Sequence, residues 1–496
     1  RKGGSGVFVQ KPARLVLKEV QCADGTANPP VTSANGARFC RAGEAFKMTV
    51  EAQSVQGNST PNFGNENVPK GIFLEKRLLL PQDGNSHDPA LALQGLTGFM
   101  NGAVTATEQS WPEVGIISIT PRLGDAAADG GMILSDQYLG AGDVPSEGVS
   151  IGRFYPSHFQ TEVGSVGRME CPSVMTCPEG GFFYTGQPFE VTVKACPYGD
   201  EVCAGRLENY RGDFAAAVKL SVWGVRGSNA AADQNPPNAA RNGGYLEPMP
   251  GGGLSAPRIT SDKFVGSDGF GGLFIASFRY AHTLKTEPVE PSDIYIRAEE
   301  DGRDGISSRR PAAASSSPEG GIRLARGRLL LGNNFGSERG NLEIPLQIQF
   351  WHCVADRCDW MTSATDATRI EPDSALADAD KRAALAVSLH QMEGRATVAE
   401  VDRLELSSGT GKIVLRPPGG EASFNVSVNL GDSAEDNACD HAAGGLEGAA
   451  ARRPWLRAWN GTCAQAQSGE ADPSARATFG AYSGERRRSV HSRELY

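Results

Sequence analysis

Short runs of alternating apolar and polar residues recur along the chain, and their period of two predicts β-strands. Residues 45–52 (AFKMTVEA) and 188–195 (PFEVTVKA) place every second side chain on one apolar face, as half-buried strands do. Residues 322–331 and 342–351 carry apolar-rich runs that also favour strands. Several short strands separated by Gly, Pro and Asn turns predict an all-β chain built from sandwiches of the immunoglobulin-like type.

The first two runs belong to a longer internal repeat, spaced roughly 145 residues apart, which is too long for a solenoid repeat. Each is followed by an Asn–aromatic–Gly turn, at 62–64 in the first copy and 209–212 in the second. The shared order of strand and turn makes chance alternation a poor explanation. We therefore expect two related β-sandwich domains in tandem.

A length of 496 residues accommodates about three domains. We expect a first sandwich over 1–148, a related second sandwich over 149–320 and a β-rich C-terminal domain over 321–496. Residues 303–320 (RDGISSRRPAAASSSPEG) read as a flexible linker that ends the second domain. An Ala-rich run that begins near Ser374 and ends near Gly394 predicts one short helix.

The ten cysteines fall into five pairs of sequence neighbours. The pairs are Cys22/Cys40, Cys171/Cys177, Cys196/Cys203, Cys353/Cys358 and Cys439/Cys463. An even number of closely paired cysteines predicts disulfide-stapled loops in an oxidising compartment. Metal binding is the alternative, and it is disfavoured because no pair has CxxC spacing and the chain has only seven His.

Composition and charge narrow the class of protein. The 61 Gly and 30 Pro favour many turns over long helices. A formal charge of −10 gives no basis for a nucleic-acid partner. No apolar run approaches the length of a membrane span. Residue 1 is Arg rather than Met, so we expect any export signal to lie upstream.

Candidate catalytic and metal-binding motifs are weak. Residues 148–152 (GVSIG) match GxSxG, but a nucleophile elbow needs a strand before the Ser and a helix after it. Here Pro145 and the sequence Arg-Phe-Tyr-Pro that ends at Pro156 favour a linker into a strand. Acidic runs at 299–304, 373–380 and 432–440 match no EF-hand, so solvated loops are the favoured interpretation and Ca²⁺ stays open as the alternative. We expect no catalytic residues, no resident metal and no cofactor.

The tryptophans are candidates for stacking on sugars or for packing in cores. Trp223 and Trp351 lie in strand-like runs, which favours burial in a sandwich core. Trp455 and Trp459 lie in the sequence RRPWLRAWN, and this setting leaves a surface role open.

Ordered sequence blocks resemble a known family. They are residues 152–159 (GRFYPSHF), 183–189 (FYTGQPF), 321–329 (GIRLARGRL), 334–338 (NFGSE), 472–480 (DPSARATFG) and 493–496 (RELY). Together they resemble the C-terminal region of MshQ-like proteins of MSHA-type type IV pilus systems. The chain departs from the family pattern at residues 365–367 (TDA), where the family usually carries a Cys.

The resemblance implies an exported protein at the surface of a Gram-negative bacterium, tied to a type IV pilus, with no known catalytic residues. Implied partners are pilin or minor pilin subunits or another surface protein, and host or environmental glycans are a further option. We therefore expect a non-enzymatic, extracellular structural or adhesive protein. A lectin-like carbohydrate-binding module is the alternative, and a secreted hydrolase is a weaker one.

The cysteine pattern gives the first testable prediction. Mass spectrometry of unreduced tryptic peptides should find all ten cysteines oxidised, in five bridges between sequence neighbours. Four or more free thiols would contradict it.

Overall fold

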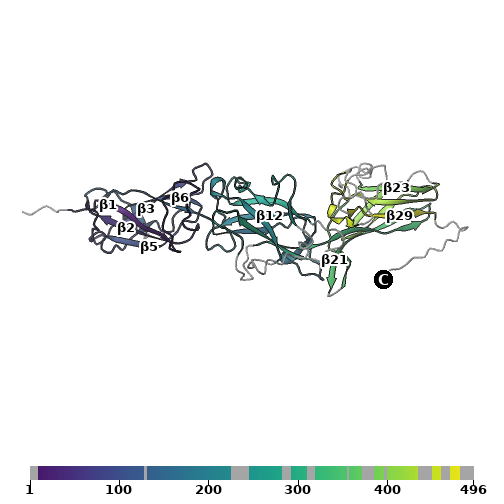
Figure 1. Ribbon diagram of the computed structural model, residues 1–496, viewed down its shortest axis with the longest axis horizontal. Coiled ribbons are helices and arrows are strands. Elements are labelled where there is room, and N and C mark those ends of the chain that lie inside the picture. Colours follow the sequence, from purple (N-terminus) through teal and green to yellow (C-terminus); the bar gives the residue numbers. More distant parts are fainter. Residues whose placement is uncertain are drawn as a thin grey trace, which may run out of the picture.

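Three β-sandwich units follow one another along a drawn-out chain (Figure 1). The structure is a computed structural model that describes residues 9–127, 131–224, 245–281, 292–309, 319–354, 357–370, 385–395, 399–433, 450–459 and 470–480. Within these ranges every regular element is a strand or a short 3-10 turn, so the all-β prediction is confirmed. The same ranges contain no helix long and apolar enough to cross a membrane.

The first unit packs two sheets around one core. One sheet has the order β1-β2-β5, and the other has the order β4-β3-β6-β7 with β8 also paired to β6. The bounds are β1 (Arg14–Cys22), β2 (Phe46–Gln53), β3 (Gly71–Leu80), β4 (Gly95–Leu96), β5 (Ala103–Gln109), β6 (Gly115–Ala126), β7 (Met132–Leu134) and β8 (Val149–Phe154). Trp111 and Phe154 lie at the centre of the core, with their ring centroids 5.3 Å apart.

The second unit is built in the same way. Its sheets have the orders β14-β16-β12-β9 and β10-β11-β18-β17-β13-β15. The strands are β9 (His158–Val163), β10 (Met169–Glu170), β11 (Gly181–Tyr184), β12 (Pro188–Cys196), β13 (Val218–Trp223), β14 (Tyr245–Pro248), β15 (Arg258–Ile259), β16 (Leu273–Ala281), β17 (Ser292–Glu300) and β18 (Gly321–Ala325). The 3-10 turns are η1 (Pro178–Gly180), η2 (Gly212–Phe214) and η3 (Ser261–Lys263).

The repeat seen in the sequence corresponds to a shared strand order. Val50 lies on β2, which is flanked by β1 and β5, and Val193 lies on β12, which is flanked by β9 and β16. Both valines are fully buried. In the opposite sheets, β3 pairs with β6 as β13 pairs with β17. The two repeated valines thus occupy equivalent central strands.

The third unit packs the sheet β19-β21-β25-β24, with β22 added to β21, against the sheet β20-β29-β26-β23. Its elements are β19 (Gly327–Leu331), β20 (Asn334–Gly336), β21 (Leu342–Val354), β22 (Arg357–Thr362), β23 (Val387–Gly394), β24 (Val401–Ser407), β25 (Thr410–Leu415), β26 (Ala422–Val428), η4 (Pro454–Leu456), β27 (Ala458–Trp459), β28 (Glu470–Ala471) and β29 (Ser474–Phe479). β27 and β28 form a separate two-stranded sheet.

Three expectations from the sequence need correction. The predicted helix that ends near Gly394 is wrong at that end, because 387–394 form β23 on the edge of a sheet. Residues 371–384, where the rest of the helix was expected, lie outside the described residues. The sandwiches also extend past the expected boundaries. β8 pairs with β6 of the first unit, and β18 pairs with β17 of the second, so strand pairing moves both boundaries toward the C-terminus.

The third correction concerns the expected linker. Its first residues, up to Arg309, are described and pack at the joint between the first and second units, whereas 310–318 lie outside the described residues. Arg153 donates two hydrogen bonds to Asp304, at 2.7 and 2.5 Å, and both side chains are about 95% buried. Arg303 donates to the carbonyl oxygen of Ala34. Residues 303–309 are therefore a fixed part of the joint.

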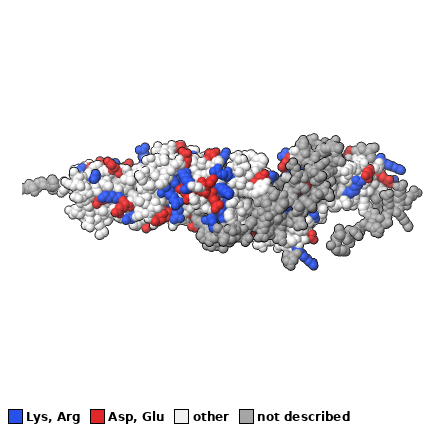
Figure 2. Space-filling model, in the orientation of Figure 1, with Lys and Arg blue, Asp and Glu red and all other residues white. Residues whose placement is uncertain are grey.

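Apolar contact reinforces this joint. Residues of the first unit contribute directly to the core of the second; they are Val31, Ala34, Ala42, Val114, Ile116 and Tyr155. Glu113 is 1% exposed and accepts hydrogen bonds from the main-chain nitrogens of Glu208 and Asn209. Burial raises the pKa of the Glu113 carboxyl, and hydrogen bonds from His87 and from the main-chain nitrogens of Val114 and Asn209 oppose the rise. Acidic and basic side chains gather side by side over the middle of the elongated body (Figure 2).

The second and third units share a strand. Phe183 of β11 belongs to the second core, while its neighbours Phe182 and Tyr184 belong to the third. β11 pairs in parallel with β18, and Tyr184 donates its hydroxyl to Asp366 at 2.5 Å. Because side chains alternate across a strand, one short segment anchors two sandwiches.

The buried pair at this joint predicts that alanine substitutions of two neighbouring aspartates differ greatly in how far they lower the free energy of unfolding. Asp304→Ala leaves the Arg153 guanidinium buried without its carboxylate, which should cost about 3–5 kcal/mol. Asp301→Ala removes a partner from an exposed pair with Arg258 and should cost about 0–1 kcal/mol. Guanidinium unfolding of the full chain measures both variants. Equal losses would contradict a joint held by the buried pair.

Candidate functional site

The GxSxG motif has no catalytic setting in the structure. Ser150 lies inside the extended strand β8, and its hydroxyl donates to the carbonyl oxygen of Val31 at 3.2 Å. A nucleophile elbow is a sharp turn between a strand and a helix, which exposes the Ser hydroxyl. The motif is therefore part of the first unit's sheet.

The acidic run 299–304 has a structural role. The Glu300 carboxylate accepts hydrogen bonds from the main-chain nitrogens of Asp304 and Ile306, and burial raises its pKa. Asp304 is bound to Arg153, as described above. These carboxylates already have partners and do not form an open cage of oxygen ligands. The run 373–380, and the run 432–440 beyond Ser433, lie outside the described residues.

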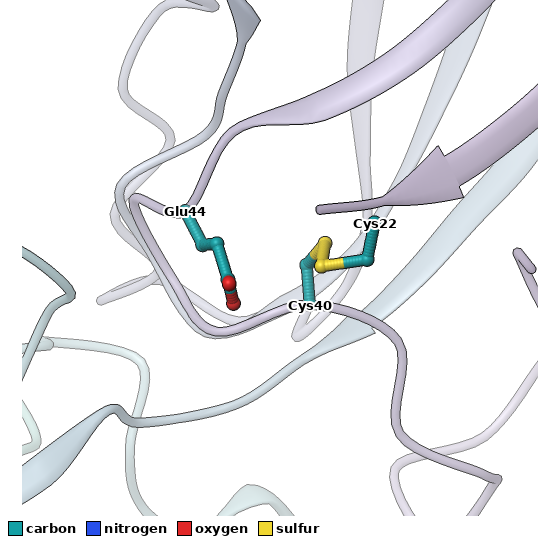
Figure 3. Close-up of side chains that lie close together, drawn as sticks. All are labelled: Cys22, Cys40 and Glu44. Atoms are coloured by element: carbon teal, nitrogen blue, oxygen red, sulfur yellow. A yellow bond between two sulfur atoms is a disulfide. The ribbon is translucent and has the colours of Figure 1, made fainter. Parts of the chain in front are cut away.

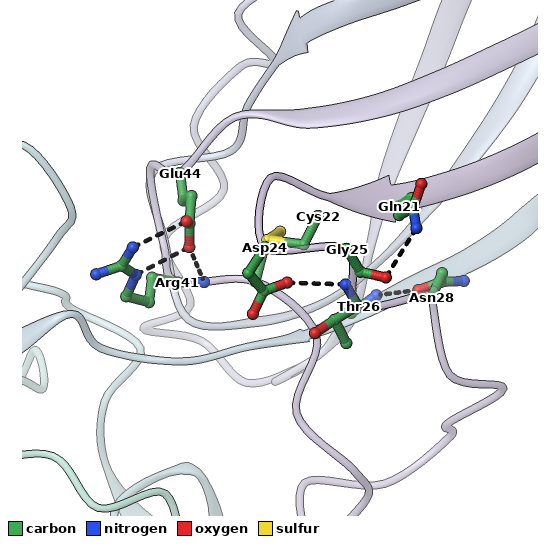
Figure 4. The surroundings of a disulfide bond; sticks show 10 residues. Gln21, Cys22, Asp24, Gly25, Thr26, Asn28, Arg41 and Glu44 are labelled. Atoms are coloured by element: carbon green, nitrogen blue, oxygen red, sulfur yellow. Dashed lines mark hydrogen bonds and ion pairs between the residues drawn. A yellow bond between two sulfur atoms is a disulfide. The ribbon is translucent and has the colours of Figure 1, made fainter.

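One cluster has the composition of a metal site but not its chemistry. Potential ligand atoms of Cys22, Cys40 and Glu44 lie within 4.8 Å of one another (Figure 3). The two sulfurs are joined in a disulfide, whereas a cysteine ligand must be a thiolate. Glu44 accepts two hydrogen bonds of 2.9 Å from the guanidinium of Arg41 (Figure 4). The cluster is therefore structural: the disulfide and the Arg41–Glu44 ion pair hold residues 22–44 in place, and we call this segment the pinned loop.

This pinned loop contacts the second unit. The Arg41 guanidinium lies 4.2 Å from the ring centroid of Tyr198, and the main-chain nitrogen of Tyr198 donates to Ala42. Tyr198 belongs to the short loop closed by the bond between Cys196 and Cys203. Residues directly after the Cys22–Cys40 bond therefore meet the loop closed by Cys196–Cys203 at the first joint.

Four disulfides occur in the described residues. They are Cys22–Cys40, Cys171–Cys177, Cys196–Cys203 and Cys353–Cys358. Cys439 and Cys463 lie outside the described residues. Bonds of this kind form and persist in oxidising compartments, so the chain is a secreted or surface protein.

The hairpin formed by the end of β21 and by β22 projects beyond the third sandwich (Figure 1). Cys353 pairs with Cys358 across the strands near its tip, and Trp351 pairs with Trp360. The two indole rings meet edge to face, with their centroids 5.4 Å apart. Both tryptophans are partly exposed. The core position expected for Trp351 is wrong, because alternation places Phe350 in the core and Trp351 on the opposite face.

Polar groups border this tryptophan pair. The Arg328 guanidinium lies 4.1 Å from the ring centroid of Trp360 and donates to the side chain of Gln349 at 2.8 Å. Partial burial lowers the pKa of Arg328, and Asp359 opposes that shift. We call Arg328, Gln349, Trp351 and Trp360 the hairpin platform. Tryptophan and arginine are enriched where proteins bind other molecules, so the platform is a candidate contact surface.

The other tryptophans have different settings. Trp223 is partly buried and lies 4.4 Å from the guanidinium of Arg297, which forms a buried pair with Glu319. Trp455 lies on η4 at the joint of the second and third units. The side chain of Trp459 lies outside the described residues. Sequence reasoning missed the hairpin platform, although the close cysteine pair between Trp351 and Trp360 marked a stapled turn.

Two short disulfides should differ in their effect on stability. Cys353→Ser with Cys358→Ser should speed hydrogen exchange in 349–362 while leaving the global unfolding midpoint nearly unchanged, because the bond lies in a projecting hairpin. Cys196→Ser with Cys203→Ser should cost about 2–4 kcal/mol, because both cysteines are buried beside the joint. The opposite ranking would contradict these roles.

Comparisons with solved structures find distant resemblances. Invasin, a bacterial integrin-binding protein, matches at 9% identity and a TM-score of 0.21, over 84% of this chain and 56% of that chain. The cadherin-like domains 1 to 4 of zebrafish RET match at 8% identity and 0.19, over 87% and 69%. Escherichia coli alpha-2-macroglobulin activated by porcine elastase matches at 10% identity and 0.16, over 84% and 42%. The chain thus spans little more than half of the invasin chain.

Comparison with curated proteins finds no match. Family models cover most of the chain, in order. The second domain of DUF6701 matches residues 11–110, the third domain matches 113–320 and the fourth matches 325–495. The division between the third and fourth matches lies at the joint of the second and third units, whereas the first division falls before β6, so the third-domain match also includes β6, β7 and β8 of the first unit. The chain therefore belongs to the DUF6701 family.

Proposed function

We propose that the chain is a rigid, non-catalytic part of a bacterial surface protein and acts by binding. The observation that carries the proposal is the way the units are joined. The Arg153–Asp304 pair is buried at the first joint, and β11 contributes to two cores at the second. Joints with buried polar and apolar contacts resist bending, whereas small polar interfaces between domains permit motion. A stiff row of sandwiches suits a protein that holds a contact surface away from the cell.

We propose further that the surface structure is a type IV pilus of the MSHA type. The support is the ordered resemblance of the blocks from residue 152 to residue 496 to MshQ-like proteins. The proposed partner is a pilin, a minor pilin or another surface protein, which contacts the hairpin platform. A pair of partly exposed tryptophans beside an arginine suits such a contact, because aromatic and arginine side chains are enriched where proteins bind one another.

The second candidate is carbohydrate binding, which is favoured by a pocket at the second joint that Tyr245, Arg279 and Trp455 line. Under either candidate the chain catalyses no reaction. In agreement with this, the Ser150 hydroxyl donates to a main-chain carbonyl oxygen, the Glu300 carboxylate accepts from the main-chain nitrogen of Asp304, and the Asp304 carboxylate pairs with Arg153.

The hairpin platform gives a test in cells. A strain that carries the parent gene with Trp351→Ala and Trp360→Ala should show reduced surface attachment or pilus display, by about tenfold if the pair is a binding hot spot. The matched control is Phe335→Ala, which removes another exposed aromatic from the same unit. Quantitative attachment assays and immunolabelling of pili measure the effect, with surface levels of the protein checked in parallel.

Normal piliation and attachment in a strain lacking the parent gene, together with loss of an extracellular enzymatic activity, would contradict the proposed function. Equal attachment of the double variant and the Phe335→Ala control would show that the hairpin platform is not the contact surface.

A further inference from the structure

The first unit lies at one end of the row of described units and meets the second unit on one side only (Figure 1). β6 begins at that joint, where Ile116 enters the second core, and it ends at the opposite end of the unit, where Gly124 pairs with Gly71. At this opposite end β1 begins and β2 ends, since Arg14 pairs with Gln53. The first unit therefore has one end covered by the second unit and one end away from it.

Exposed apolar side chains gather at the end away from the second unit. Among the described residues of the first unit, every exposed large apolar side chain lies in a turn or an edge strand there. These side chains are Val55, Val68, Met100, Ile133, Leu134 and Leu139, with exposed fractions from 49 to 84%. We call these six residues the distal face. Exposed apolar groups that gather on one surface mark a contact site, whereas scattered ones are ordinary.

The turns that carry the distal face are held against one another. The Ser59 hydroxyl donates to the carbonyl oxygen of Asn101, which joins the turn after β2 to the turn before β5. The buried ring of Phe63 packs against Phe99 and Tyr138, with centroid distances of 4.8 and 5.7 Å. Turns from both sheets thus form one preformed surface, which loses little conformational entropy when a partner binds it.

The composition around the distal face suits contact with a protein surface of low charge. Lys70 is neutralised by Asp125, and the Tyr138 hydroxyl donates to Glu66 at 2.7 Å. Exposed neutral side chains surround the apolar ones; they are Asn58, Asn62, Asn65, Asn67, Asn101 and Gln137. An apolar surface with a polar border is the usual arrangement of a protein–protein interface.

Leu139 has a backbone conformation that folding alone does not favour. Its φ is 52°, in the left-handed region that bulky side chains rarely adopt, and its side chain is 49% exposed. Glycine or asparagine would fit this turn with less strain. A leucine that is strained and half exposed contributes little to the core of the first unit, so contact with something outside the unit explains it better.

The family order and the path of the chain indicate what covers the distal face. The matched models are the second, third and fourth domains of DUF6701, and the second begins at residue 11, so the family order places a first domain before that residue. Lys11 donates to the carbonyl oxygen of Asp143, between β7 and β8, and the chain then enters β1 at the distal end. A domain that precedes residue 11 is therefore attached beside the distal face.

We propose that the distal face binds the first DUF6701 domain of the parent protein. The covered end of the first unit supplies the precedent, because Val31, Ala34 and Ile116 there enter the core of the following unit. A short connection also gives a domain attached at residue 11 a high effective concentration at this face. The inference goes beyond the proposed function, since it adds an interface at the opposite end of the row from the hairpin platform.

The test compares hydrogen exchange in the parent protein, which includes the first domain, with exchange in the chain of residues 1–496. We expect slower exchange in 54–58, 99–102 and 132–142 when the first domain is present, because docking suppresses local opening. Equal exchange in all three segments overturns the proposal. Sedimentation equilibrium of the 1–496 chain tests a second copy as the occupant, and a dimer that is lost on substitution of the distal face also overturns it.

Val55→Asp with Met100→Asp is the first variant. Both side chains are largely exposed, so Tm of the 1–496 chain should stay unchanged, while the charges should weaken docking of the first domain and reduce the added protection by about tenfold. The matched control is Val166→Asp with Val202→Asp, which adds the same charge at exposed valines of the second unit and should leave the protection intact.

Leu139→Asn separates docking from folding. Asparagine adopts the left-handed conformation more readily than leucine, so Tm of the 1–496 chain should stay unchanged or rise slightly. The added protection in the parent protein should nevertheless fall, because the apolar contact is lost. Full protection in both distal-face variants overturns the proposal.

Discussion

The buried ion pair between Arg153 and Asp304 is the interaction on which the shape of the molecule depends. Taking two charges out of water costs several kcal/mol per ion, and the cost is recovered only when the partners meet with good geometry. Here the carboxylate accepts two hydrogen bonds from one guanidinium, and the Arg38 side chain donates to the Asp304 carbonyl oxygen. The pair can form only when the first and second units are correctly joined. It therefore fixes their relative orientation as well as adding contact.

The disulfides act on a different scale. The described bonds join cysteines 5 to 18 residues apart, so each closes a local loop and none ties one unit to another. Their contribution to the elongated shape is indirect. The bonds Cys22–Cys40 and Cys196–Cys203 hold two loops in the conformations that meet at the joint, through Arg41 and Tyr198. Local covalent constraints thus prepare surfaces that noncovalent contacts then join.

The joint between the second and third units is rigid and also contains a small cavity. β11 uses strand alternation to place aromatic side chains in two cores, which leaves little freedom between the units. The same joint brings the ends of β14 and β16 beside η4 and so creates a small cavity. The hairpin platform belongs to the same third unit but faces outward from β21 and β22. A rigid joint keeps both candidate surfaces in a fixed geometry, which reduces the entropy lost on binding.

The local sequence pattern alone predicted many of the strands and the four disulfides of the described residues. The alternation in 188–195 predicted β12, and the repeat predicted that Val50 and Val193 would occupy related strands, because a strand's period of two is written in neighbouring residues. Only the tertiary structure decided what joins the units. Asp304 lies in a Gly- and Ser-rich stretch that resembles a linker, and its partner is 151 residues away. Trp351 has strand periodicity, but the choice between core and outer face depends on which side of β21 the opposite sheet covers. The hydroxyl of Tyr280 and the indole nitrogen of Trp455 are buried without a hydrogen-bond partner, and no sequence signal predicts this, because a missing partner depends on position in space and not on order along the chain.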